Sequence, residues 1–401
     1  MRKSFFALPV MAVLMAGNVS AQSPGVEVIT ADDITEIGNL TEIAYDFKIH
    51  PLTADTRIDA IGGIKSWDGG KVMLARNGSS NKIMRFDDYK LTGEVDGMRR
   101  GEYYMIEDFS YDKANNSIYI ENDSNLVTYD ATTFRYKGKQ SVNMMIQNIL
   151  NLGDKMLYFG YLTDEYYAPR YQNDKVRMPK ESMILVDRDE RNLKKGVILY
   201  RESSFERQNL GYPELFFVNP KNRSTCLPGN VNRIVTFDDK KITEVYKFQL
   251  GRDFVPQKYL DVFTKEEAEI EEMENALRMV SMLGGSPTIS LTYNIMVDNG
   301  TVSFRTAYNN RGGEFGALSR YLYWVHNKKG TQVYRHLRIP GLNIDIDPTG
   351  ANGNHQIAVI ENMGSGLIDK SVPMSPLARQ IMDEINNQSN GNPVLIEFRF
   401  K

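Results

Sequence analysis

The stretch "DFSYDKANNSIYIENDSNLVTYDATTF", from Asp108 to Phe134, predicts three short strands joined by two tight turns. The polar segments between the strands carry Asn and Asp, which tolerate the positive φ that hairpin turns require. An earlier stretch, "IKSWDGGKVMLARNGSSNKIMRFDDYKL", has the same order of strands and turns. In both, the third strand ends in an aspartate, and Asp87 and Asp130 are 43 residues apart. This spacing is typical of a four-stranded propeller blade.

The same unit recurs along the chain with insertions. A third unit has Asp187 at the matching position, and a fourth has Asp238. In a fifth unit either His326 or Asn327 replaces the aspartate. The repeat therefore predicts a series of similar blades rather than a single sheet.

A sixth unit, formed by residues 343–361 and 392–401, lacks its final strand. We expect residues 40–50 to supply that strand, because pairing of the two chain ends closes a ring and removes exposed sheet edges. The predicted fold is all-β: a six-bladed β-propeller of four-stranded blades. An inserted helix at about 264–284 lies between blades four and five, with a short helix in blade six. An open β-sandwich or two separate domains are the alternatives.

The N-terminus predicts export. Arg2 and Lys3 precede an apolar run, and small residues lead up to Ala21, as in a signal peptide. The run is shorter than the roughly 20 apolar residues of a transmembrane helix, and no cysteine lies near the cleavage site to carry a lipid. We expect cleavage after Ala21, a linker over 22–39, a propeller over 40–401, and a periplasmic or secreted, monomeric protein.

Composition excludes several classes of partner. Without Arg2 and Lys3, the mature chain has 46 basic and 51 acidic residues, a net charge of −5. This balance argues against nucleic acid and anionic membrane as partners, which call for a clustered basic surface. Cys226 is the only cysteine, so no intramolecular disulfide can form.

The segment "VDGMRRGEYYMIEDFSYD", from Val95 to Asp112, resembles the bacterial TolB-like (NHL-like) six-bladed propellers of exported proteins. Their recurring motif is Gly-x-Gly-Pro-Gly-Glu-Tyr followed by an Asp-Phe strand. The matching residues here are Gly97, Gly101, Glu102, Tyr103, Asp108 and Phe109, whereas Arg99 and Arg100 stand where Gly and Pro are usual. The resemblance extends over essentially the whole mature chain, and it implies a fold without implying a reaction.

Four long insertions are expected on one rim of the propeller, where loops between blades and loops between second and third strands meet. Loops on a rigid scaffold often carry binding residues, and aromatic rings with arginine forks suit sugars, peptides and carboxylates. An alternative is that the insertions pack on one another as a structural lid. The ligand-binding candidates are Tyr166, Tyr167, Arg170, Tyr171, Arg177, Tyr308, Arg311, Glu314, Phe315, Arg99 and Arg100.

No catalytic set, cofactor motif or metal site is recognised. The four histidines lack zinc spacing, and neither a nucleophile elbow nor a P-loop occurs. "DIDPTGANGNHQ" begins like a calcium loop with Asp345 and Asp347, but Gln356 occupies the position of the bidentate glutamate. An ordinary turn between two strands is the favoured interpretation.

The sequence thus predicts an exported binding module whose insertion-bearing face engages a protein, peptide or glycan of the bacterial envelope. The alternative is a hydrolase or lyase acting on polysaccharide or peptide, with carboxylates at the channel mouth as general acid and base. A purely structural subunit is the third reading.

Overall fold

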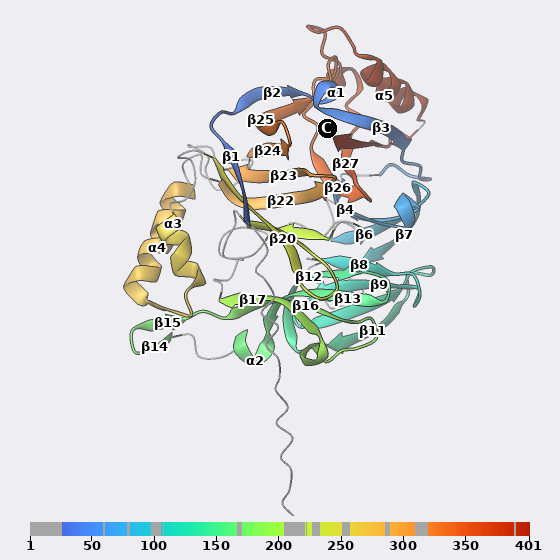
Figure 1. Cartoon of the computed structure of the whole chain (residues 1–401). Coiled ribbons are helices and arrows are strands. Elements are labelled where there is room, and N and C mark those ends of the chain that lie inside the picture. Colours follow the sequence, from blue (N-terminus) through green and yellow to red (C-terminus); the bar gives the residue numbers. More distant parts are fainter. Residues whose placement is uncertain are drawn as a thin grey trace, which may run out of the picture.

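The computed structural model shows an all-β protein made of successive antiparallel sheets with few helices (Figure 1). It describes residues 26–58, 61–77, 81–97, 106, 108–166, 171–203, 221, 223–226, 233–250, 257–284, 289–308, 320–388 and 390–401. The statements below concern these residues. Residues 1–25, with the predicted signal peptide, lie outside this set.

The predicted repeat units form the sheets. Sheet one contains β4 (Ile61–Trp67), β5 (Val72–Asn77), β6 (Lys82–Asp87) and β7 (Lys90–Asp96); sheet two contains β8 (Phe109–Asp112), β9 (Ser117–Asn122), β10 (Asn125–Asp130) and β11 (Tyr136–Ser141). Sheet three contains β12 (Met144–Asn151), β13 (Lys155–Leu162), β16 (Lys180–Asp187) and β17 (Val197–Ser203).

In the later units, too, strands that follow one another in sequence are neighbours in an antiparallel sheet. Sheet four contains β18 (Ser224–Cys226), β19 (Arg233–Phe237) and β20 (Ile242–Leu250); sheet five contains β22 (Ile289–Asp298), β23 (Thr301–Tyr308), β24 (Arg320–Asn327) and β25 (Gly330–Arg338). Sheet six contains β26 (Pro348–Asn352), β27 (His355–Ile360), β28 (Val394–Phe400) and β3 (Ala44–Pro51). Sheets one and six join through a parallel bridge between Gly350 and Ile64. A Cβ on Gly350 would lie 2.5 Å from the carbonyl oxygen of Ile64, so this close approach requires glycine.

The N-terminal segment differs in part from its prediction. β3 pairs antiparallel with β28, as expected for the two chain ends, but the strand begins at Ala44. Before it, Asn39 Oδ1 accepts a hydrogen bond from the Thr41 amide (3.1 Å) and caps a helical turn, α1 (Leu40–Ile43).

We expected a linker over 22–39, but its described residues contain two strands. β1 (Val26–Ala31) pairs parallel with β20, and β2 (Thr35–Asn39) pairs parallel with β25. The side chain of Ile29 is fully buried against sheet four. The segment therefore extends the outer edges of two neighbouring sheets before it enters sheet six.

A buried ion pair links the inner strands of sheets one, two and three. Lys65 on β4 and Asp108 just before β8 are both 0% exposed, and Lys65 Nζ lies 2.7 and 2.9 Å from the two Asp108 carboxylate oxygens. On β12, the Ile149 amide donates to Asp108 (2.8 Å), and the Ile149 carbonyl accepts from Lys65 (2.9 Å). Burial lowers the pKa of Lys65, and Asp108 offsets part of that shift.

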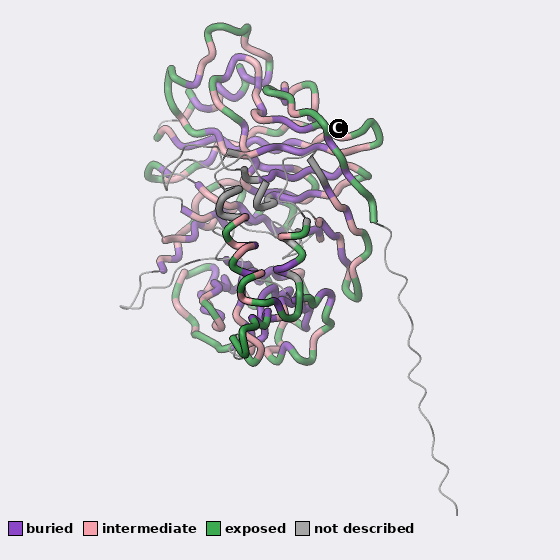
Figure 2. Tube along the Cα trace, turned by 90° about the vertical axis from the view of Figure 1, so that its left-hand side faces the viewer, coloured by how far each residue is buried: buried purple, intermediate pink, exposed green. Residues whose placement is uncertain are grey.

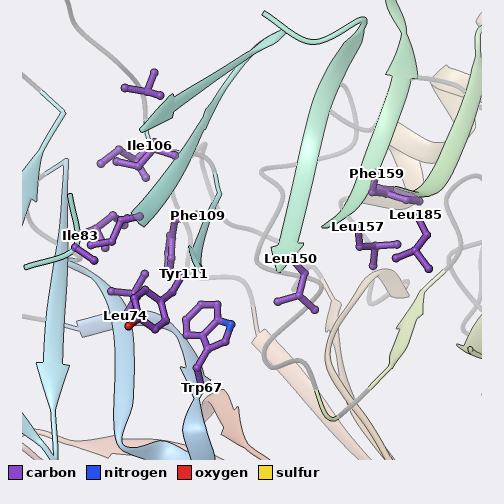
Figure 3. Close-up of a cluster of buried hydrophobic side chains, with 14 of the residues drawn as sticks. Trp67, Leu74, Ile83, Ile106, Phe109, Tyr111, Leu150, Leu157, Phe159 and Leu185 are labelled. Atoms are coloured by element: carbon purple, nitrogen blue, oxygen red, sulfur yellow. The ribbon is translucent and has the colours of Figure 1, made fainter. Parts of the chain in front are cut away.

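Other side chain to backbone hydrogen bonds join neighbouring sheets near their inner strands. Ser66 donates to the Ala351 carbonyl (2.7 Å), Ser224 donates to the Ile295 carbonyl (3.4 Å), and Asn294 donates to the Pro348 carbonyl. Between the sheets lie apolar clusters, the largest of which brings together Trp67, Phe109, Leu150 and Leu185 from sheets one, two and three (Figure 3). Burial is concentrated along the strands, while turns and helices are more exposed (Figure 2).

The repeated aspartate has a local structural cause. Asp130 and Asp238 each accept hydrogen bonds from the amides two and three residues ahead (2.7–3.0 Å), which closes the turn into the next strand. These bonds, led by that from Thr133, lower the pKa of Asp130 to about 2. In sheet five Asn327 has this role, accepting from the amide two residues ahead (2.9 Å), so Asn327 rather than His326 is the equivalent residue.

The helices lie in the connections. α2 (Thr163–Tyr166), β14 (Tyr171–Gln172) and β15 (Lys175–Arg177) follow β13, whereas α3 (Gln257–Leu260), β21 (Glu267–Glu269) and α4 (Ile270–Gly284) follow β20. α4 begins at Ile270, after a 3-10 turn (Asp261–Thr264) and β21, so the predicted helix start at about 264 is wrong. The remaining 3-10 turns are Asp68–Gly70, Leu193–Lys195 and Gly364–Leu367.

The helix in sheet six packs on its own sheet. α5 (Pro376–Asn387) begins with Pro376 after the cap Ser375, whose Oγ accepts from the Ala378 amide (3.2 Å). Its buried face contacts β3 and β28. This insertion therefore covers the flank of a sheet, as Figure 1 shows beside β3.

Candidate functional site

A cavity of about 250 Å³ lies between sheets one, five and six. Its described lining comes from six strands or strand ends: Gly62, Gly63, Arg76, Asn294, Arg305, Tyr321, Asp347 and Thr349. Arg76 is near the end of β5, Tyr321 is near the start of β24, and Asp347 directly precedes β26. In antiparallel meanders these strand ends are neighbours. The cavity consequently lies at the end of the sheets that carries the long connections.

The position of Arg305 is fixed on two sides. Its Nη1 donates to Asp347 Oδ1, and its guanidinium lies 4.1 Å from the centre of the Tyr321 ring. The Arg305 side chain is 5% exposed, whereas that of Asp347 is 39% exposed. Solvent thus reaches the Asp347 carboxylate, whereas the Arg305 guanidinium is largely buried.

Asp347 also accepts a hydrogen bond from the Tyr323 hydroxyl (3.2 Å). Burial raises the pKa of Tyr323 well above its ordinary value, and the Asp347 charge adds to the shift. Tyr323 is therefore a neutral donor at physiological pH. Together, Arg305 and Tyr323 hold Asp347 in one orientation at the cavity wall.

The described lining contains two guanidinium groups and one carboxylate, those of Arg76, Arg305 and Asp347. Arginine forks recognise carboxylate and phosphate groups, and each of these three charged residues already has a partner within the protein. Two carboxylates facing one another, as in glycoside hydrolysis, are not part of this described lining.

The segment that begins like a calcium loop has another structure. Asp345 accepts from Arg338 Nε (3.0 Å) and lies 2.6 Å from His336 Nδ1, whereas Asp347 faces Arg305. Asp345 therefore bonds to residues of β25, whereas Asp347 bonds to residues of β23 and β24. Pro348–Asn352 forms β26, and the turn at Gly353 leads into β27, so the segment contains the expected ordinary turn between two strands. Within the described ranges, no group of three or more His, Cys, Asp or Glu side chains could hold a metal ion.

A second polar cluster is buried between sheets six and one, at the end opposite the long connections. Glu397 is 0% exposed and accepts from the Tyr89 hydroxyl and from Asn352 Nδ2, both at 2.9 Å. The rings of His50 and Tyr89 are stacked with centroids 3.9 Å apart. Burial lowers the pKa of His50, although Glu397 acts in the opposite direction, and burial raises that of Tyr89. These mutual bonds favour a structural role.

The predicted ligand-binding residues are only partly described. Tyr166 ends α2, and its ring lies 5.7 Å from that of Tyr161. Tyr171 on β14 is 70% exposed, and Arg177 on β15 is also exposed. Tyr308 ends β23, which provides Arg305 to the cavity, but its side chain is outside the described set. The other candidates also lie outside the described residues: Tyr167, Arg170, Arg311, Glu314, Phe315, Arg99 and Arg100.

The structure brings two predicted insertions together. β15 pairs antiparallel with β21, so Arg177 lies opposite Glu267. Nearby, Lys180 Nζ donates to Glu266 (2.7 Å), and this bond, assisted by Arg177, lowers the pKa of Glu266. Tyr171 and Arg177 are therefore on one small sheet, separate from Tyr166.

The sequence interpretation missed Arg76 and Arg305. Their signal was an arginine inside a predicted strand, in "VMLARN" and "TVSFRTAY". A charge in a buried strand requires a partner, and that alone would have marked both residues as candidates. Their convergence depends on strands far apart in the sequence.

The chain is similar to solved structures of low sequence identity. A protein from Bacteroides fragilis NCTC 9343, named as a candidate exported protein, superposes with a TM-score of 0.60 at 13% identity, covering 94% of this chain and 100% of its own. A DUF4221 family member from Bacteroides vulgatus has a TM-score of 0.44 at 10% identity, with 90% and 97% covered. No curated protein matches the chain.

Across the described helices, none has the length and apolar character needed to cross a membrane. The DUF5128 family, whose description is 6-bladed beta-propeller, matches residues 21–328, which is more than half of the chain. The chain belongs to this DUF5128 family of six-bladed β-propellers.

Proposed function

We propose that this chain is an exported binding module whose insertion-bearing end engages a protein, peptide or glycan of the bacterial envelope. The observation that carries the proposal is a small unit built from two connections about 80 residues apart in sequence. We call it the insertion subdomain and define it as residues 171–178 and 257–284. Figure 1 shows its helices and short strands beside the main sheets.

The insertion subdomain has an apolar core of its own. Val176 and Met178 from the first connection pack with Phe263, Ala268 and Met273 from the second, and all five are less than 5% exposed. The Met178 amide also donates to the Glu266 carbonyl (2.9 Å). A unit with its own core presents a defined surface, which is what a binding site on a scaffold requires.

The exposed side of the small sheet suits recognition. Tyr171, opposite Val176 in the register, offers an accessible aromatic ring at the edge of the sheet, and Lys175 and Arg177 offer cations on the other face. The acidic residues Glu271 and Glu274 are exposed on α4. Exposed aromatic and charged groups are typical of surfaces that bind peptides or sugars.

Several finer assignments belong to the same proposal. We infer cleavage after Ala21, periplasmic or secreted residence, a monomeric state, and a closed ring of six blades of the TolB-like (NHL-like) type. The likeness to a candidate exported protein supports this fold, and the family description supports six blades. The candidate residues beyond Tyr171 and Arg177 stay predictions.

The alternative function is a hydrolase or lyase at the channel mouth. Such an enzyme requires two carboxylates converging on one pocket. In the described cavity lining Asp347 is the one carboxylate, and it is bonded to Arg305. This composition favours binding over hydrolysis.

The test is capture of defined envelope fractions by the mature protein. In the test variant, short Gly-Ser linkers replace residues 171–178 and 257–284. The matched control replaces exposed Lys328 and Lys329 by serine in the β24–β25 turn, at the opposite end of the sheets. The probes are detergent-solubilised envelope proteins, peptidoglycan and surface polysaccharide, offered separately.

We expect one fraction to bind the mature protein and the control but not the test variant, while all three proteins melt within a few degrees. Equal binding by all three proteins, or binding by none, would refute the proposal. The fraction that binds identifies the class of partner.

A further inference from the structure

We propose that the N-terminal segment is a pH-dependent latch on the outer edges of sheets four and five. We call residues 26–39 the N-terminal strap; it contains β1 and β2 and runs beside β20 and β25 (Figure 1). The latch is closed in mildly acidic solution and opens more often as the pH rises through the range in which histidine loses its proton. This inference goes beyond the proposed binding role, because it involves no residue of the insertion subdomain.

The placement of the histidines points to the latch. The chain has four histidines, and each meets a carboxylate in a pair of which one member belongs to residues 26–51. The pairs, with the distance from the imidazole Nε2 to the carboxylate oxygen, are His326–Glu27 (3.1 Å), His336–Glu36 (3.7 Å), His355–Asp46 (2.7 Å) and His50–Glu397 (3.5 Å). Every histidine therefore lies where the N-terminal strands meet the rest of the sheets.

The strap is held by few buried side chains. β2 buries none, because its one buried residue is Gly38. β1 buries Ile29 and Ala31, whereas Val26 and Val28 are each 57% exposed. Both strands pair parallel with their neighbours, and parallel pairing is slightly less stable per residue than antiparallel pairing. Polar contacts at the surface consequently have a large share in keeping the strap closed.

His326 on β24 responds to pH through Glu27 on β1. Its Nδ1 lies 2.9 Å from the Thr331 hydroxyl, which can donate or accept and so suits both forms of the ring. Tyr246 is opposite Glu27 on β20; burial raises its pKa, so it is neutral, and its hydroxyl donates to Glu244 (3.0 Å). Among the described residues, Glu27 is thus the charged group that His326 contacts, and protonation of the ring strengthens this contact.

His336 on β25 lies between two carboxylates. Asp345 is 2.6 Å from its Nδ1 and holds the ring whether the strap is closed or open, so Glu36 is the partner that opening removes. Arg338 Nε donates to Asp345 (3.0 Å), and Arg335 Nε lies 3.2 Å from Glu36. Arginine keeps its charge at these pH values. The arginines therefore supply the constant part of the attraction to the strap, and His336 supplies the part that changes with pH.

The histidine pairs at β3 do not have the same sign. Lys48 Nζ lies 3.4 Å from His355 Nε2, so this lysine opposes the charge that Asp46 favours. Burial lowers the pKa of His50, with Lys48 acting in the same direction and Glu397 against it, so His50 resists protonation. β3 also pairs antiparallel with β28 over most of its length. We therefore limit the latch to β1 and β2.

The latch controls access to two sheet edges. β1 is the outermost strand of sheet four, and β2 is the outermost strand of sheet five. When the strap opens, β20 and β25 become the outermost strands, and Ile29 leaves the apolar cluster that contains Phe248 and Trp324. A free strand edge accepts another strand. The pH thus sets how often these edges are available for pairing.

The experiment is amide hydrogen exchange of the mature protein at pH 5.5 and 7.5, followed by mass spectrometry of peptides that cover residues 26–39. Protection factors are compared, because they remove the pH dependence of chemical exchange itself and report local opening. An exposed ion pair shifts an equilibrium about two- to fivefold. Protection of β1 and of β2 should each be higher at pH 5.5 by that factor. The assay uses no envelope partner, so its outcome does not depend on the proposed function.

Variants assign the effect to the two histidines. His326→Gln should remove the pH dependence chiefly in β1, and His336→Gln chiefly in β2. The matched control is His355→Gln, which removes a histidine that likewise contacts an N-terminal carboxylate but leaves the strap contacts in place. The control should retain the full change in protection.

Glu27→Gln and Glu36→Gln remove the same two pairs from the strap side, at exposed positions, and should give the same result as the histidine variants. The proposal is wrong if the mature protein has equal protection of residues 26–39 at both pH values. It is also wrong if the pH dependence persists when His326 and His336 are both replaced by glutamine.

Discussion

Replacing Lys65 by methionine should destabilise the protein by about 3–5 kcal/mol, the usual cost of removing one partner from a buried ion pair. The two side chains are fully buried, and Lys65 Nζ contacts both oxygens of Asp108 and the Ile149 carbonyl. Methionine fills a similar volume but leaves the Asp108 carboxylate without its countercharge. The Ile149 amide continues to donate to Asp108, which keeps the loss from being larger.

The double variant Lys65→Met/Asp108→Asn separates charge from packing. It removes both charges, and the asparagine oxygen can still accept from the Ile149 amide. We therefore expect it to be more stable than the sum of the two single changes predicts, by at least about 2 kcal/mol. Equilibrium unfolding in guanidinium chloride, followed by tryptophan fluorescence and circular dichroism, gives the four free energies of unfolding.

An exposed pair on the same sheet is the control. Lys82 and Glu94 are 2.8 Å apart but about one third exposed, so Lys82→Met should cost less than about 1 kcal/mol. The reasoning would be refuted if the losses of unfolding free energy from the single changes at Lys65 and Asp108 simply added in the double variant. It would also be refuted if Lys65→Met cost no more stability than Lys82→Met. Either result would mean that the inner-strand ion pair does not hold sheets one, two and three together.

Three further changes test other parts of the structure. Because burial lowers the pKa of His50, the folded protein resists protonating it, and stability should fall as pH drops below about 6.5; His50→Gln should flatten this part of the stability curve, measured by urea unfolding between pH 5 and 8. The pKa of Asp130 is about 2 in the folded protein, so its contribution is complete above about 4 and disappears as pH falls through 2; Asp130→Ala should remove that acid-dependent loss, and an unchanged profile would contradict the turn-closing role. Met178→Ala should cost about 2–5 kcal/mol within the insertion subdomain and speed amide hydrogen exchange in residues 257–284 without exposing the main sheets, whereas Tyr171→Ser, at an exposed site, should change neither.

The sequence indicated the repeated unit because the relevant contacts are local. Asp130 and Asp238 bind amides two and three residues away, so the motif and its physical cause lie within one turn. The same reasoning left His326 and Asn327 open in sheet five, because either could follow the strand. The hydrogen bond to Asn327 decides between them.

The N-terminal strands could not be predicted in the same way. β1 and β2 pair parallel with β20 and β25, more than 200 residues away. No tight turn announces a parallel pairing, and the short run "VEVITA" is followed by two aspartates that suggest a loop. The helix start was also misplaced, because the pairing of β21 with β15 holds residues 267–269 extended.

The cavity was beyond sequence reasoning for a further reason. Arg76 and Arg305 are 229 residues apart, and nothing local relates them. Asp347 was noticed only as a calcium ligand, because acidic residues at alternate positions indicate cation binding when their partners are unknown. Once Arg305 is placed beside it, the same carboxylate is seen to be the partner of an arginine on another sheet.

The cavity and the insertion subdomain differ in how they depend on the sheets. The cavity is lined by residues of the strands themselves, close to the inner-strand hydrogen bonds that join neighbouring sheets, so its geometry should be as stable as the fold. The insertion subdomain has its own core, and its 3-10 turn (Asp261–Thr264) contacts β17. Sequence changes in that subdomain can therefore alter its surface without a cost to the sheets. We infer that partner choice resides in the insertion subdomain, because its surface can change while the sheets stay intact.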